Sequence, residues 1–79
     1  MSHWVICYDI ADDRRRNQLR SLLKRYGDPV QESVFEARLR PAALRRLRSQ
    51  VDSVVHPEED RVAFYELASN EPAGSLVVA

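Results

Sequence analysis

Five consecutive apolar and aromatic residues, Trp4 to Tyr8, stand almost at the start of a chain of 79 residues. A short run rich in β-branched and aromatic residues is typical of a strand that is buried on both faces, in the middle of a sheet. A chain of this length forms one domain and buries only about 60–65% of its unfolded surface. The layers that cover this central strand must therefore be few and short.

Two stretches have the 3.6-residue periodicity of amphipathic helices. The first helix is predicted over residues 13–26 and the second over residues 41–55. We expect Asp12 or Asp13 to cap the first helix, and Gly27 to end it in the left-handed conformation. The apolar stripes consist of Leu19, Leu22, Leu23 and Tyr26 in the first helix, and of Leu44, Leu47, Val51 and Val54 in the second.

The remaining segments are extended in character. Residues 30–39 are long for one strand, and two short strands joined by a tight kink near Glu32 and Ser33 are the alternative. Residues 61–67 are predicted to form a strand. The order of elements predicts an α+β protein with a ferredoxin-like βαββαβ fold, in which two helices cover one face of an antiparallel sheet.

The other face of that sheet has no helix to cover it. The strands carry more apolar residues than two helices can hide, so we expect this face to pack on a second copy in a symmetric homodimer. Residues 68–79 are expected to be a linker and a short extra strand, Leu76 to Val78. One use for this tail strand is pairing with an edge strand of the partner protomer. The whole chain, residues 1–79, is thus predicted to be a single domain.

Several classes of protein are excluded by composition. The single cysteine, Cys7, excludes an internal disulfide and a thiolate zinc cluster, and it fits a reducing cytoplasm. The sequence contains no run of eighteen apolar residues and no signal-peptide pattern, so neither a membrane span nor secretion is expected. It also lacks a glycine-rich phosphate loop and a zinc-type Cys/His spacing.

The charges are divided unevenly along the chain. The net charge is zero, yet residues 1–48 carry a net +5 and residues 49–79 a net −5. Eleven of the twelve basic residues are arginines, which bind phosphate bidentately. The asymmetry predicts a polyanionic partner on one face, such as the backbone of DNA or RNA. The alternative is that arginine richness only reflects a GC-rich genome.

Asp9, which ends the first apolar strand, is the sharpest candidate for catalysis and for metal binding. In a dimer with a two-fold axis, Asp9 could face its symmetry mate, and a divalent cation such as Mg²⁺ or Mn²⁺ would relieve the repulsion between the two carboxylates. A metal of this kind activates water and stabilises a pentavalent phosphate. The alternative is that Asp9 only accepts hydrogen bonds within its own turn.

Three consecutive arginines open the first predicted helix, where the helix dipole disfavours cations. These candidates for nucleic-acid binding are Arg14, Arg15 and Arg16. Contacts with phosphates would explain their position, and neutralisation by Asp12 and Asp13 is the alternative. Phe35 is expected to be a core residue, with stacking on a base as the alternative.

A series of short motifs occurs in a particular order between about residue 3 and residue 67. They are Tyr8-Asp9-Ile10, Asp13-Arg14-Arg15, Tyr26-Gly27, the run from Val30 to Glu36, Glu59-Asp60-Arg61-Val62, and Tyr65. In this order they resemble the small CRISPR-associated adaptation endonuclease family, the lesser of the two universal spacer-acquisition proteins. The Tyr-Asp-Ile strand end and the Val-Gln-Glu-Ser-Val-Phe-Glu run are the most specific together.

The resemblance implies a homodimer whose tail strand crosses to the partner, and a Mg²⁺ site built from Asp9 of each protomer. It also implies that Tyr8 and Phe35 are neighbours of the active centre. Some members of the family look like metal-dependent nucleases that act on RNA or double-stranded DNA. Others bridge dimers of the larger CRISPR integrase and hold the DNA backbone through arginines. The choice between an endonuclease and a non-catalytic scaffold of the adaptation complex stays open.

Two departures from the family pattern affect the expected partner geometry. Many members carry a lysine soon after the arginine pair, and Asn17 stands in that neighbourhood here. The C-terminal part is also short, ending at Ala79, so a segment that contacts the integrase is expected to be reduced.

Overall fold

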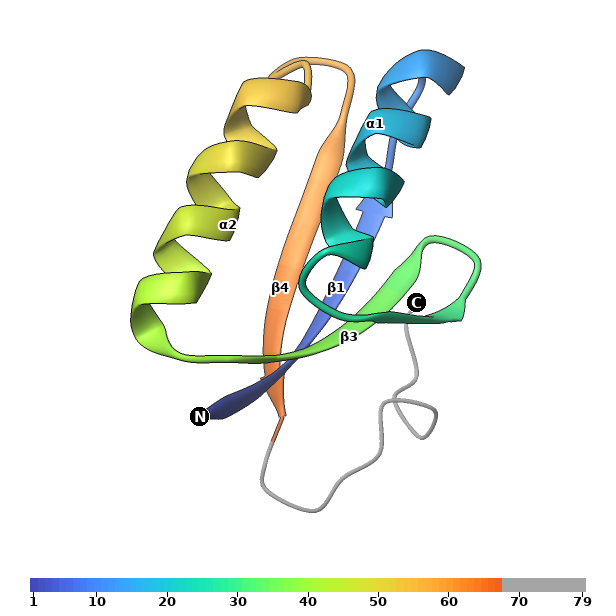
Figure 1. The fold of residues 1–79 in the computed structure, drawn as a ribbon. Helices are drawn as coiled ribbons and strands as arrows, with labels where there is room; N and C mark the ends of the chain where they lie inside the picture. Colours follow the sequence, from blue (N-terminus) through green and yellow to red (C-terminus); the bar gives the residue numbers. More distant parts are fainter. Residues whose placement is uncertain (68–79) are drawn as a thin grey trace.

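Two helices lie side by side on one face of a four-strand antiparallel sheet (Figure 1). The computed structural model describes residues 1–67, and the predicted linker and tail strand lie outside the described residues. The strand order is β2-β3-β1-β4, so the first strand is central, as predicted. The ferredoxin-like βαββαβ order is confirmed. Its elements are β1 (Ser2–Asp9), α1 (Asp13–Lys24), β2 (Asp28–Gln31), β3 (Val34–Leu39), α2 (Pro41–Val54) and β4 (Arg61–Leu67).

Side chains of β1 alternate between the two faces of the sheet, as the pleat requires. Ile6 and Tyr8 pack in the main core, which the helices cover. Val5 belongs instead to a small second cluster with Leu67, against which Cys7 packs. The largest side chains that are fully enclosed include Phe35, Ile6, Leu19, Leu23 and Leu47, and all five belong to the main core.

Both helices form where the apolar spacing predicts them. Asp12 is the N-cap of α1, and its carboxylate accepts a hydrogen bond of 2.9 Å from the Arg15 backbone N–H. The two helices bury Leu19, Leu22 and Leu23 from α1, and Leu47 and Val51 from α2. None of the helices in the described part of the chain is long and apolar enough to cross a membrane.

Residues 30–39 divide into two strands, as the alternative with a kink predicts. Ser33 stands at the turn between β2 and β3 with a φ of 64°, in the left-handed region that residues other than glycine adopt uncommonly. The Ser33 carbonyl accepts a hydrogen bond of 3.1 Å from the Tyr8 backbone N–H. This bond fixes the turn to the end of β1, next to Asp9.

The predicted role of Gly27 is wrong. Gly27 does not have a positive φ, and the C-cap of α1 is Arg25 in the right-handed conformation. A Cβ at Gly27 would collide with the Glu36 carbonyl oxygen and would lie 2.7 Å from the Ala37 Cβ. A glycine is therefore needed for the close approach of the chain after α1 to β3, and not for a left-handed cap.

Candidate functional site

Asp9 is exposed at the end of the central strand, where it pairs in register with Arg61 of β4. Strand alternation places it on the same face as Val5 and Cys7, the face that no helix covers. Asp9 and the half-exposed Tyr65 line a shallow depression of about 720 Å³ on this part of the sheet. A second molecule or a ligand can therefore reach the Asp9 carboxylate.

Cys7 lines the same depression but has little nucleophilic character. Burial raises the pKa of the Cys7 thiol, which keeps it protonated and unreactive at neutral pH. The depression thus depends for its chemistry on carboxylate and guanidinium groups.

Tyr8 and Phe35 lie on the opposite face of the sheet, inside the main core. Their rings are tilted relative to each other, with centroids 6.3 Å apart, and Phe35 is only 1% exposed. The Tyr8 hydroxyl is buried without a hydrogen-bond partner in residues 1–67. Tyr8 thus lines the depression next to Asp9 while its ring packs in the main core. Phe35 does not line the depression, and its burial agrees with its interpretation as a core residue.

Arg15 is held by a buried carboxylate, Asp60, at the entry to β4. Its Nε donates to Asp60 Oδ2 at 2.8 Å and its Nη2 donates to Oδ1 at 3.3 Å. The same carboxylate accepts from the backbone N–H of Ala11 at 3.0 Å and from that of His56 at 2.8 Å. We call Asp60 and these three donors the Asp60 clamp, because it joins the start of α1 to the loop that precedes β4.

Electrostatics stabilise this clamp in its charged form. The hydrogen bond from Arg15 holds the pKa of Asp60 well below its ordinary value, burial opposes that effect, and the backbone donors of His56 and Ala11 add to it. The pKa of Arg15 is raised mainly by the same hydrogen bond. Asp60 is therefore ionised at neutral pH, and its acceptor capacity is used within the fold.

The three consecutive arginines have different surroundings. Arg16 donates to the Asp13 carboxylate and, at 3.1 Å, to the Ile10 carbonyl oxygen. Arg14 is exposed and forms no ion pair within residues 1–67. Neutralisation by a neighbouring acid thus holds for Arg16, which pairs with Asp13, whereas Arg15 pairs with the distant Asp60 and, at 3.4 Å, with Glu59.

A divalent cation fits this site only in part. Residues 1–67 contain no group of three or more His, Cys, Asp or Glu side chains that could hold a metal ion. Asp12 is used as a helix cap and Asp13 is paired with Arg16. Asp9 supplies one carboxylate, the ligand type that Mg²⁺ prefers, so a cation there needs further oxygen ligands from a second copy, water or phosphate.

The burial of Asp60 is not signalled by any of the sequence motifs. What places Asp60 is the register between β1 and β4. Asp9 pairs with Arg61 in antiparallel strands, so Asp60, the residue before Arg61, lies next to the chain that follows Asp9. That register is unknown until the strands are paired.

Comparison with known proteins yields a consistent set of relatives. The family model described as CRISPR associated protein Cas2 matches residues 1–73. CRISPR-associated endoribonuclease Cas2 3 of Synechocystis sp. is 42% identical, over 95% of this chain and 97% of its own. CRISPR-associated endoribonuclease Cas2 of Thermus thermophilus is 48% identical, over 80% of this chain and 67% of its own.

Solved structures with the same fold are similar in sequence as well. Streptococcus pyogenes Cas2 superposes with a TM-score of 0.81 at 26% identity, covering 86% of this chain and 88% of its own. A chain from a partial Cas6-RT-Cas1–Cas2 complex superposes with a TM-score of 0.80 at 36% identity, covering 87% of this chain and 81% of its own.

Proposed function

Since the chain belongs to the Cas2 family of CRISPR-associated proteins, we propose that it binds nucleic acid in CRISPR spacer acquisition, as a homodimer with endonuclease activity. Its two copies would meet through the sheet face that no helix covers. The relatives' name, endoribonuclease, supports the activity. A similar chain in a complex with Cas1 supports the larger CRISPR integrase as a partner, which the homodimer would bridge.

The exposure of Asp9 at the end of β1 is the observation that carries this proposal. Two copies packed on the helix-free face bring a pair of carboxylates toward each other, and Mg²⁺ or Mn²⁺ offsets their repulsion. When bound, the cation supplies an activated water and stabilises charge on the phosphate. Asp9 holds the cation, while Arg61 opposite it in register adds positive charge that attracts the nucleic-acid backbone.

The test compares Asp9→Asn with Asp52→Asn, which removes another exposed carboxylate, on α2. Cleavage of RNA and of double-stranded DNA is measured with Mg²⁺ and with EDTA. Loss of a direct metal ligand is expected to reduce cleavage by about 100-fold or more, while Asp52→Asn cleaves like the wild type. Equal Mg²⁺-dependent cleavage by all three proteins would contradict a role for Asp9.

A non-catalytic scaffold is the second candidate function. It is favoured by the absence of a three-ligand metal cluster from residues 1–67 and by the use of Asp60 within the fold. Spacer insertion with the integrase partner separates the two functions. If Asp9→Asn inserts spacers as well as the wild type and neither protein cleaves nucleic acid, the scaffold function holds and the endonuclease function fails.

The dimer is testable independently of cleavage. Sedimentation velocity at micromolar concentration is expected to give about twice the chain mass of 9.1 kDa. A monomer under these conditions would remove the shared cation site, because the second Asp9 carboxylate would be missing.

A further inference from the structure

We propose that Asp60 is a positioning residue for Asp9, because its buried carboxylate fixes the chain that follows the end of β1. This inference rests on the proposed cation site and adds a residue that acts on the position of Asp9 and not on the cation itself. Within residues 1–67 the Asp9 carboxylate accepts no hydrogen bond. Its position therefore depends on the backbone on either side of it.

The pairing of β1 with its neighbouring strands stops at Asp9. Pairing with β3 ends at Cys7, and pairing with β4 ends at Asp9 itself, which lies opposite Arg61. Beyond Asp9 the chain has no strand partner before α1 begins at Asp13. Contacts other than strand pairing must hold this connection in place.

The Asp60 side chain takes over where the strand pairing stops. Continuing the register past Arg61 places Asp60 opposite Ile10, the residue after Asp9. The Asp60 Oδ1 accepts the Ala11 backbone N–H at 3.0 Å, a bond that a main-chain carbonyl would accept in a longer ladder. A side-chain acceptor thus extends the contact between the two segments beyond Asp9.

A positioning group must itself be immobile, and Asp60 is held from several sides. Its side chain has no exposed area, and the His56 backbone N–H and the Arg15 Nε both donate to its Oδ2 at 2.8 Å. The Asp60 N–H in turn donates to the His56 carbonyl oxygen at 2.9 Å, which closes the loop before β4. Asp60 is thus fixed relative to β4, and its bond to Ala11 fixes the chain after Asp9 as well.

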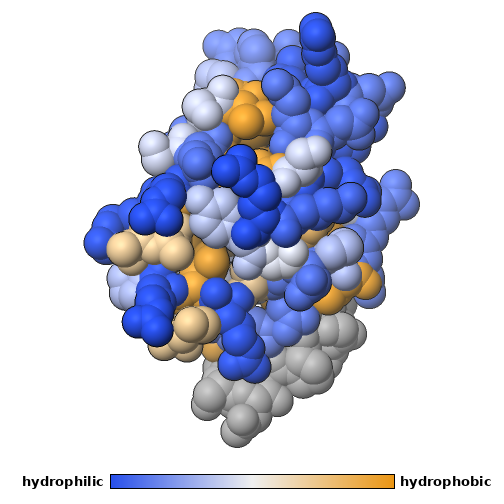
Figure 2. Space-filling model, viewed as in Figure 1, coloured by the Kyte–Doolittle hydropathy of each residue, from blue (hydrophilic) through white to orange (hydrophobic). Residues whose placement is uncertain are grey.

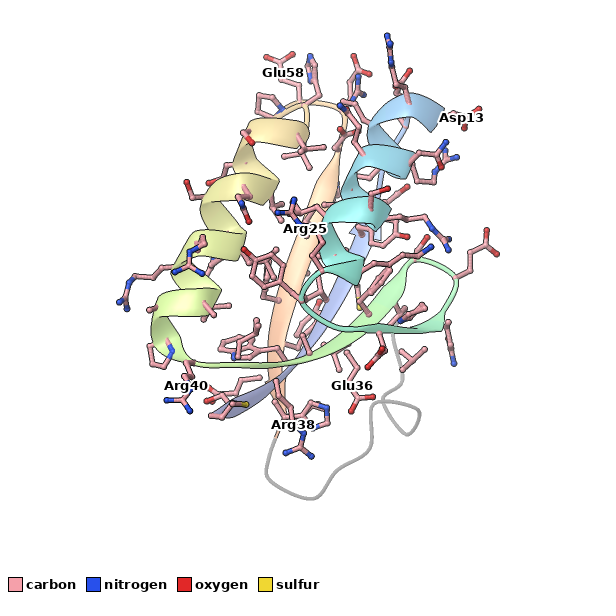
Figure 3. The ribbon with its side chains drawn as sticks, in the orientation of Figure 1. Asp13, Arg25, Glu36, Arg38, Arg40 and Glu58 are labelled. Atoms are coloured by element: carbon pink, nitrogen blue, oxygen red, sulfur yellow. The ribbon has the colours of Figure 1, made fainter. Side chains whose placement is uncertain are left out.

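The two segments that Asp60 joins meet at one end of the molecule. Figure 3 shows Glu58, from the loop before β4, and Asp13, at the start of α1, at the same end. The surface there consists mainly of hydrophilic residues (Figure 2), whereas the Asp60 side chain is fully enclosed. Because hydrogen bonds are stronger away from water, the enclosed carboxylate connects the two segments more firmly than a contact on that surface would.

The expected consequence is an Asp9 carboxylate that is held ready for a cation. Two carboxylates from two copies must be placed to share one ion, and a small shift of either strand end separates the ligands. Loss of a group that orients a metal ligand weakens metal binding by about 10–100-fold. Removing the Asp60 carboxylate should therefore weaken cation binding although Asp9 is still present.

The first test measures Mn²⁺ binding without nucleic acid, by electron paramagnetic resonance at a temperature where every variant is folded. Asp60→Asn is expected to raise the Kd for Mn²⁺ about tenfold. Leu39→Ala is the destabilised control, because Leu39 is buried and pairs with Ser2, at the opposite end of β1 from Asp9. It should keep the wild-type Kd. Equal Kd values for Asp60→Asn and the wild type would overturn the positioning role.

The dependence of cleavage on Mg²⁺ concentration separates positioning from folding. A purely structural role lowers the maximal rate, since fewer molecules are folded, and leaves the half-saturating Mg²⁺ concentration unchanged. Positioning predicts that Asp60→Asn needs about tenfold more Mg²⁺ for half-saturation, with a maximal rate close to that of the wild type. Asp9→Asn should stay below the wild-type rate at every Mg²⁺ concentration. An unchanged half-saturating concentration in Asp60→Asn would contradict the proposal.

Arg15→Lys replaces Asp60→Asn if the latter does not fold. Lysine keeps the positive charge but lacks the two-nitrogen fork that holds the Asp60 carboxylate, so the Kd for Mn²⁺ should rise by about threefold. A wild-type Kd in folded Arg15→Lys would then count against the positioning role.

The outcomes also distinguish this role from the proposed function. If the wild type binds no Mn²⁺ and its cleavage is the same with Mg²⁺ and with EDTA, the Asp9 site and the role of Asp60 fail together. If the wild type binds Mn²⁺ and Asp60→Asn binds it equally well, the Asp9 site stands and only the positioning role fails.

Discussion

The Arg15 Nε and the Asp60 Oδ2 lie 2.8 Å apart, although 45 residues separate them in the sequence. Their hydrogen bond joins the first turn of α1 to the residue that precedes β4. Because β4 pairs with β1 up to Asp9, the clamp also determines where the end of the central strand lies. The arginine expected to contact nucleic acid thus has a structural role at the edge of the candidate site.

Removing the charge of Asp60 is expected to destabilise the fold. In Asp60→Asn the amide nitrogen cannot accept hydrogen bonds, and Arg15 loses its ionised partner. We expect the Tm at pH 7 to fall by about 5 °C or more. Thermal denaturation followed by circular dichroism measures this, with Asp52→Asn as the exposed control. A Tm equal to that of the control would show that the clamp contributes little.

The same pair predicts how stability depends on pH. The pKa of Asp60 is lowered in the folded state, so its contribution is complete above the unfolded pKa of about 3.9 and is lost as the pH falls further. The Tm difference between wild type and Asp60→Asn should therefore be constant above about pH 5 and shrink below about pH 4. A difference that grows as the pH falls would contradict this assignment.

Replacement by glutamine is expected to affect stability at Arg15 and nucleic-acid binding at Arg14. Arg15→Gln leaves Asp60 buried without its guanidinium, so we expect a clear loss of Tm. Arg14→Gln removes an exposed side chain and should change the free energy of unfolding by no more than about 0.5 kcal/mol, while weakening nucleic-acid binding. Denaturation and anisotropy on the same two preparations distinguish the roles. If Arg15→Gln is as stable as the wild type but binds nucleic acid more weakly, Arg15 has the binding role that we assign to Arg14.

A methyl group at Gly27 is expected to disrupt the contact between the chain after α1 and β3. Gly27→Ala should destabilise the protein by about 1–3 kcal/mol, since its Cβ would collide with the Glu36 carbonyl oxygen and the backbone would have to shift. Urea denaturation measures the change. Asp28→Ala, at an exposed position of the next strand, is the control and should have a smaller effect.

Substitutions of Phe35 distinguish a core residue from one that stacks on a base. Phe35→Ala should lower the free energy of unfolding by about 3–5 kcal/mol, because the enclosed ring leaves a cavity. Phe35→Leu keeps most of the apolar volume, so we expect it to bind nucleic acid like the wild type at a temperature where both are folded. Weaker binding by folded Phe35→Leu would instead support contact with a base.

Local patterns were sufficient for the elements of this fold. The spacing of Leu19, Leu22 and Leu23 predicts α1, and the carboxylate of Asp12 caps it as expected. The apolar run of β1 predicts a central strand because only a strand covered on both faces tolerates such a run. These features depend on neighbours within a few residues, so sequence alone resolves them.

Other features of the fold and of the candidate site depend on contacts between segments far apart in the sequence. The burial of Asp60 and its capture of Arg15 depend on the register between β1 and β4. The need for glycine at position 27 depends on how closely the chain after α1 approaches β3. The packing of the Tyr8 ring in the main core, while Asp9 is exposed, follows from which face of the sheet the helices cover.

The order of strands and helices, the apolar face of each helix and the carboxylate at the end of the first strand all follow from sequence patterns. The folded chain was needed to show that Asp60 captures Arg15, whereas Arg14 forms no ion pair within residues 1–67. Periodicity and capping act within one element, whereas an ion pair such as Arg15–Asp60 forms only when segments far apart in the chain are packed together.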